Sequence, residues 1–101
     1  MRTIEIDGKS YNIKFTTHAG AEMERRENKR IDQLIDTSLT SVELALWGGL
    51  KTNHPSITVE QAGALVDAYG DRTALMTILL EEMRDAGFFG LAAKEPPNPK
   101  R

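Results

Sequence analysis

The chain contains no cysteine, few aromatic residues and a single tryptophan. The absence of cysteine excludes disulfide bonds, thiolate zinc sites and cysteine nucleophiles. No apolar run approaches the roughly 20 residues that a membrane-spanning helix needs, and the N-terminal residues lack the apolar stretch of a signal peptide. We therefore expect a protein of a reducing compartment, the cytoplasm, without a membrane partner.

Neither sign of charge is in large excess, because 13 basic and 15 acidic residues give a net charge of −2. This balance provides no long-range attraction to nucleic acid or to anionic lipid. A chain of 101 residues has room for one core. We expect a single domain over residues 1–90, followed by a flexible, disordered tail over 91–101 that contains Pro96, Pro97 and Pro99.

Residues 2–15 alternate between apolar and polar side chains around Asp7-Gly8. Asp-Gly is a strong signal for a type I′ hairpin turn, which needs positive φ at both central residues. With these two residues in the turn, the apolar side chains share one face: Ile4, Ile6, Tyr11, Ile13 and Phe15. An isolated hairpin is marginal in water, so this face must rest on helices.

The remaining chain has helical spacing of apolar residues and several N-cap signals. Thr16 or Thr17 can cap the first helix, Thr40 and Thr58 begin capping-box patterns, and Asp71 can cap the last helix. The predicted helices cover about 17–29, 31–38, 41–52, 58–69 and 72–87. The sequence therefore predicts an α+β fold, with an N-terminal two-stranded β-hairpin packed on a small bundle of four to five helices.

Two consecutive glycines, Gly48 and Gly49, follow the tryptophan near the end of the predicted helix 41–52. Phosphate-binding glycine loops open a helix, where the positive end of the dipole faces the anion. These glycines lie at the opposite end of a helix, so a ligand loop is disfavoured. Because glycine costs ~1 kcal/mol inside a helix, we expect close helix packing or an early helix end.

The sequence offers no recognisable constellation for catalysis or for a cofactor. The two histidines, His18 and His54, do not have the H-x-x-x-H spacing of a metal site. No nucleophile and base can be paired from the spacing. We predict that the protein is not an enzyme and needs no cofactor or metal.

Two charged stretches permit alternative interpretations. Glu81, Glu82 and Asp85 lie near the end of the last predicted helix, where carboxylates oppose the dipole unless a cation compensates them. The stretch 24–30, "ERRENKR", is basic enough to suggest nucleic-acid contact. However, Glu24 and Glu27 interleave with its basic residues, which favours an ion-paired surface.

Trp47 lies off the main apolar stripe of its predicted helix, beside Leu44. A tryptophan in this position either closes a small core or forms an exposed anchor for a partner. The same two hypotheses apply to Phe88 and Phe89, which follow the last predicted helix.

The order of these segments resembles the tail assembly chaperones of long-tailed bacteriophages and related gene-transfer particles. The resemblance covers about residues 4–90 and rests on a pattern of common residues rather than on one diagnostic motif. The matching positions are Ile6, Gly8, Tyr11, Ile13 and Phe15; Leu46, Trp47, Gly48, Gly49 and Leu50; Pro55, Ile57, Thr58 and Glu60; and Gly70.

The resemblance implies a chaperone that binds helical segments of the tape-measure protein in the host cytoplasm, keeps it soluble during tail assembly, and possesses no enzymatic activity. It also implies a homo-oligomer and possible contact with the tail tube protein. Our candidates for the partner surface are Trp47, Leu50, Leu80, Met83, Phe88 and Phe89. The alternative function is a small nucleic-acid-associated regulator or antitoxin-like domain, motivated by residues 24–30, although the charge balance argues against a nucleic-acid partner.

Overall fold

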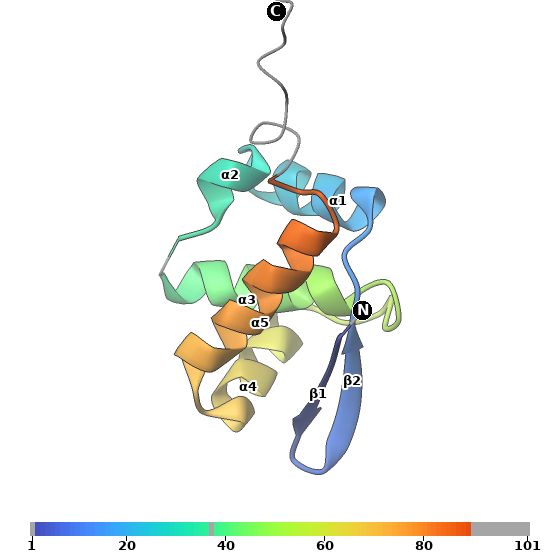
Figure 1. The fold of residues 1–101 in the computed structure, drawn as a ribbon, viewed down its shortest axis with the longest axis vertical. Helices are drawn as coiled ribbons and strands as arrows, with labels where there is room; N and C mark the ends of the chain where they lie inside the picture. The colour runs from blue at the N-terminus through green and yellow to red at the C-terminus, as the bar shows by residue number, and fades with distance from the viewer. Residues whose placement is uncertain (1, 37, 90–101) are drawn as a thin grey trace, which may run out of the picture.

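The computed structural model describes residues 2–36 and 38–89. Figure 1 shows an N-terminal hairpin at one end of a group of five helices. Strands β1 (Arg2–Ile6) and β2 (Lys9–Ile13) are followed by α1 (Thr17–Glu27), α2 (Ile31–Leu34), α3 (Leu39–Leu50), α4 (Val59–Tyr69) and α5 (Arg72–Asp85). The predicted α+β architecture is confirmed. The predicted tail, 91–101, lies outside the described residues.

The hairpin has the predicted turn and register. Asp7 and Gly8 have φ values of 53° and 81°, as a type I′ turn requires. β1 and β2 are antiparallel, with Ile4 opposite Tyr11 and Ile6 opposite Lys9. The apolar face of the hairpin is buried against the helices, except that Tyr11 is only half-buried.

The first two helices are shorter than predicted. Thr16 caps α1 by accepting a hydrogen bond from the Ala19 N–H group at 3.0 Å, and Asn28 ends the helix in the left-handed conformation with φ 57°. The predicted helix 31–38 is a single turn that ends at Leu34, because Ile35 is already extended.

Helix α3 begins two residues before the predicted start. The N-cap is Ser38, whose hydroxyl accepts from the Ser41 N–H group at 3.2 Å, so the predicted capping box at Thr40 is wrong. Leu39 therefore occupies the first turn of the helix instead of the preceding loop.

Helices α4 and α5 begin at the predicted caps. Thr58 and Gln61 form a reciprocal capping box on α4, and Asp71 accepts from the Ala74 N–H group at 3.0 Å on α5. After α5, Gly87 adopts a positive φ of 86° and donates to the Arg84 carbonyl group. This geometry is a Schellman motif, and α5 ends at Asp85 rather than at residue 87.

The center of the fold is α3, which packs against α1, α4, α5 and β2. α3 is more deeply buried than α5. Gly48 and Gly49 lie inside α3, which continues to Leu50. They therefore permit close packing of α3 against its neighbours, which is one of the two predicted alternatives. They do not end the helix, which was the other.

Candidate partner surface

Two of the six candidate partner residues belong to the core. Leu50 and Met83 are both 0% exposed, Leu50 near the end of α3 and Met83 near the end of α5. Their position on the apolar face of a helix made them candidates for the partner surface, but both side chains face the interior, where several elements meet. We therefore remove them from the candidate surface.

Leu80 lies in an apolar groove between α5 and the first turn of α3. The groove has a volume of about 260 Å³, and its apolar wall is formed by Leu39, Val42, Met76 and Leu80. Leu39 is 66% exposed and is the large apolar residue most open to solvent among the residues described. Met76 and Leu80 beside it are half-buried, so Leu39 belongs to a contiguous apolar patch, and such patches mark protein-binding surfaces.

Leu39 is not among the residues predicted for the partner surface, because the predicted helix starts at residue 41. A helix that begins at Leu39 puts this side chain one turn before Val42 and near Met76 of α5. The signal that identifies the correct start is Ser38, a strong N-cap residue directly before an apolar position.

An acidic hollow adjoins this groove on the α4 side. It has a volume of about 400 Å³ and shares Leu39, Val42 and Arg72 with the groove. Its carboxylates come from α3 and α4, namely Glu43, Glu60 and Asp67. Arg72 lies 3.4 Å from Asp67, so the charges of these two residues partly offset each other.

Trp47 is half-buried and makes internal contacts through its polar edge and its ring. Its indole N–H group donates to the Ile57 carbonyl oxygen at 3.1 Å. The Arg26 and Lys51 side chains lie 5.5 and 5.4 Å from the ring centroid, within cation–π range. These contacts tie α3 to α1 and to the segment before α4, which favours the core hypothesis for Trp47.

Phe88 is also packed against the rest of the fold. Its N–H group donates to the Met83 carbonyl oxygen at 3.0 Å, and its ring meets that of Phe15 at 5.4 Å in an edge arrangement. A Cβ atom on Gly20 would lie only 2.8 Å from the Phe88 ring. Phe88 therefore packs on α1, and Phe89 is partly buried against the same core.

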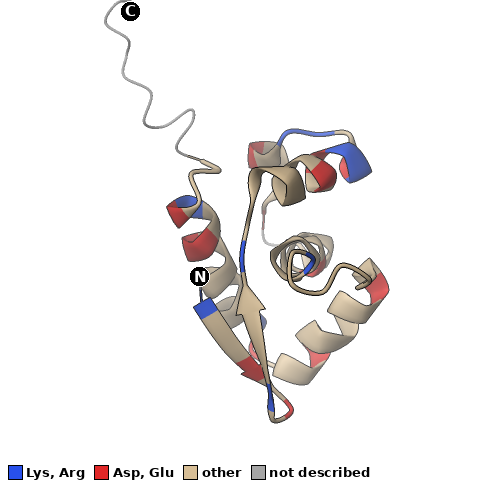
Figure 2. Cartoon of the chain, turned by 90° about the vertical axis from the view of Figure 1, so that its right-hand side faces the viewer, with Lys and Arg blue, Asp and Glu red and all other residues tan. Residues whose placement is uncertain are grey.

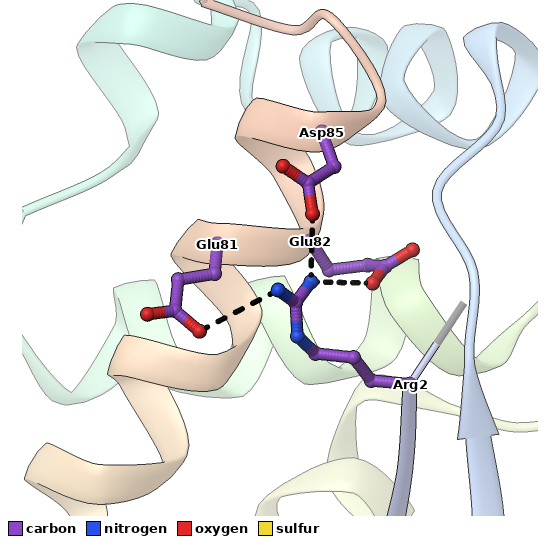
Figure 3. A network of polar contacts seen from close by, with 4 residues as sticks. All are labelled: Arg2, Glu81, Glu82 and Asp85. Carbon is purple, nitrogen blue, oxygen red and sulfur yellow. Dashed lines mark hydrogen bonds and ion pairs between the residues drawn. The ribbon is translucent and has the colours of Figure 1, made fainter.

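The acidic cluster at the end of α5 is compensated by Arg2 of β1. As Figure 3 shows, the guanidinium group reaches Glu82 at 2.8 Å, Asp85 at 3.1 Å and Glu81 at 3.6 Å. The hydrogen bond that Arg2 donates to Glu82 is the main reason that the pKa of Arg2 is raised above its usual value. Glu82 is only 6% exposed, so this contact joins the start of the chain to a nearly buried carboxylate.

The stretch 24–30 mixes both charges at the end of α1, as Figure 2 shows by adjacent blue and red segments. The Glu24 carboxylate accepts from the Ile31 N–H group at 2.8 Å and so supports the start of α2. Arg30 lies 3.2 Å from Asp32, and Arg26 lies 4.0 Å from Glu27. These contacts favour an ion-paired surface over a nucleic-acid site.

The histidines lie apart. His18 is 3.3 Å from Glu22 on α1, and His54 lies against the Tyr11 ring at a centroid distance of 5.7 Å. Across residues 2–36 and 38–89, no group of three or more His, Asp or Glu side chains is arranged to hold a metal ion.

The described part of the chain contains no helix with the length and apolar content needed to cross a bilayer. Comparison with protein-family models, with curated proteins and with solved structures found no match. The features that bear on function are therefore the geometry of this surface and the resemblance in segment order.

Proposed function

We propose that the protein is a phage tail assembly chaperone, a non-enzymatic cytoplasmic protein that binds helical segments of a tape-measure protein and keeps it soluble. The observation that carries this proposal is the apolar groove between α3 and α5, beside the exposed Leu39. A groove of this kind suits an amphipathic helix, which lays its apolar face against the groove floor.

The segment order that resembles these chaperones supports the same function. The turn at Gly8, the Trp47-Gly48-Gly49 stretch and the cap at Thr58 each have a defined place in the fold. All three are structural positions, so the resemblance concerns the scaffold, and the groove supplies the binding surface. Homo-oligomerisation and contact with the tail tube protein remain parts of this proposal.

Co-expression with the tape-measure protein encoded beside it tests the function. We expect the soluble fraction of the tape-measure protein to rise severalfold compared with co-expression of an unrelated small domain, and the two proteins to purify together. An unchanged soluble fraction, with no co-purification, would contradict the proposal.

The alternative is a nucleic-acid-associated regulator that uses the basic residues at the end of α1 and directly after it. The specific observation in its favour is the run of exposed cations at Arg25, Arg26, Lys29 and Arg30. The internal ion pairs of Arg26 and Arg30 weaken it, and the DNA-binding measurement described in the Discussion separates the two functions.

A further inference from the structure

We propose that the partner helix carries lysine or arginine along one flank of its apolar stripe, and that it lies across Leu39 with this basic flank over the acidic hollow. This inference rests on the proposed function and specifies the chemistry of the segment that the chaperone binds. The occupant is a segment of another protein, and not a second copy of this chain.

The apolar groove determines where the apolar stripe of the partner helix lies. Leu39 stands between the groove and the acidic hollow and borders both. Met76 and Leu80 are one helical turn apart on α5 and line the far wall of the groove. An apolar stripe at i, i+3, i+4 and i+7 presents side chains at the same one-turn interval, so it can fill the groove while contacting Leu39.

The acidic hollow determines the charge on the flank of the partner helix. Glu43 and Glu60 border the hollow and have no ion-pair partner among the described residues. The Glu43 side chain is half-buried against Gly63, where a carboxylate gains more from a nearby cation than it does in open solvent. A lysine or arginine on the partner supplies that cation.

One helix is wide enough to contact the groove and the hollow at once. A helix with its side chains is about 10–12 Å across, and the groove and hollow share Leu39, Val42 and Arg72 as a common border. Figure 1 shows the first turn of α3, the end of α4 and the start of α5 on the same side of the molecule. A partner helix on this side therefore meets both.

Charge also argues against a second copy as the occupant. A two-fold interface brings the same patch of both subunits together. Such an interface would enclose Glu43 and Glu60 of both subunits, with Arg72 as the one cation that lines each described patch, and like charges gathered in an interface are unfavourable. A basic partner avoids this cost.

Binding of synthetic peptides to the full chain tests the proposal. The first probe is a blocked helical peptide with a leucine stripe and a lysine flank. The second has glutamate in place of each lysine, and the third keeps the lysines but has a scrambled stripe. We expect the first peptide to bind at least tenfold more tightly than either control at low salt, with a smaller advantage over the glutamate peptide as salt rises.

Two variants and one matched control assign the contacts. Leu39→Ser should weaken the lysine peptide at least tenfold, and because Leu39 is exposed, its unfolding midpoint should stay near that of the wild type. Glu43→Gln combined with Glu60→Gln should remove the preference for lysine over glutamate. Glu27→Gln, a carboxylate on α1 outside the hollow, should leave the preference intact.

Several results would overturn the inference: equal binding of the lysine and glutamate peptides, unchanged binding by Leu39→Ser, or a dimer in sedimentation equilibrium that Leu39→Ser dissociates. Its failure can be told apart from failure of the chaperone function. If Leu39→Ser still keeps the tape-measure protein soluble, the groove assignment is wrong and the chaperone function stands. If the wild type binds the lysine peptide but does not solubilise the tape-measure protein, the groove stands and the function is wrong.

Discussion

Gly49 is a residue whose missing side chain permits α3 to contact the hairpin. A Cβ atom at this position would lie 2.9 Å from Ile13 Cγ2 and 3.0 Å from the Phe15 ring. The carbonyl oxygen of Gly49 accepts a hydrogen bond from the Lys14 N–H group at 2.9 Å. Overpacking costs roughly 1–3 kcal/mol, while alanine in place of a helical glycine returns ~1 kcal/mol. We expect Gly49→Ala to lower the free energy of unfolding by about 1 kcal/mol, measured by urea denaturation.

Gly63→Ala is the matched control for this prediction. A Cβ atom on Gly63 would meet the end of the Glu43 side chain, which is flexible and can move aside. The helix-propensity gain should then prevail, with stability unchanged or raised by up to ~1 kcal/mol. A Gly49→Ala variant as stable as Gly63→Ala would show that the contact with Ile13 and Phe15 is not tight.

Trp47 allows a second single-residue prediction. Trp47→Phe removes the hydrogen bond to Ile57 and keeps an aromatic ring near Arg26 and Lys51. We expect a loss of about 1 kcal/mol in the free energy of unfolding, measured by circular dichroism, with binding of the lysine-flanked peptide unchanged. A variant of wild-type stability that has lost peptide binding would instead identify Trp47 as a partner anchor.

Among the elements, β1 and α5 are joined by the contact of Arg2 with Glu82, although these two residues lie near opposite ends of the described chain. Arg2→Met should lower the urea midpoint, because Glu82 loses the guanidinium group that compensates its nearly buried carboxylate. Adding Glu82→Gln should restore part of the loss, since it removes the nearly buried negative charge that Arg2 contacts in the wild type. A double variant with the sum of the two single losses would indicate that the pair is not coupled.

Helices α1 and α3 are joined by an ion pair that should respond to pH. The hydrogen bond from Lys51 is the main reason that the pKa of Glu22 lies below its usual value of 4.5. A lowered folded-state pKa stabilises the fold at pH values above 4.5, and this contribution is lost as pH falls through the folded-state pKa. We expect Glu22→Gln to be less stable than the wild type at neutral pH.

The urea midpoints of wild type and Glu22→Gln should then converge as the pH is lowered below 4.5, because the protonated glutamate resembles glutamine. Lys51→Met should flatten the acid-side pH dependence of the wild type in the same way. A constant difference between wild type and Glu22→Gln over the whole range would mean that the ion pair contributes no pH-dependent stability.

Elements defined by local sequence were predicted well. The hairpin register follows from Asp7-Gly8 and the alternation around it, since a shift of one residue would expose the entire apolar face. Thr58 and Asp71 were identified as caps because their partners lie only three residues away. The error at the start of α3 came from choosing Thr40 as the cap, although Ser38, directly before an apolar residue, is the N-cap in the fold.

Elements and sites that depend on distant residues were not predictable in this way. Arg2 and Glu82 are 80 positions apart, and no spacing rule links them. Helical periodicity places Leu50 and Met83 on the apolar face of their helices, but it does not say whether a second helix covers that face. The groove forms only when α3 and α5 pack together, so Leu39 became a candidate once the fold was known.

For the whole molecule, the distribution of charge distinguishes the two functional classes. The net charge is −2, and the basic residues of α1 lie beside carboxylates, as Figure 2 shows. A nucleic-acid regulator depends on cations that release counterions from the phosphate backbone. A chaperone for basic helical segments instead depends on an acidic border around an apolar surface.

We therefore expect no mobility shift of double-stranded DNA at low salt, at protein concentrations that saturate the lysine-flanked peptide. If a shift occurs, its salt dependence decides the matter, because each phosphate contact adds about 0.9 to the slope of log K against log salt. A steep slope that Arg25→Ala and Lys29→Ala both reduce would favour the regulator, with the end of α1 and the residues directly after it as its binding surface. Peptide binding that Leu39→Ser abolishes, without any DNA complex, places function at the groove.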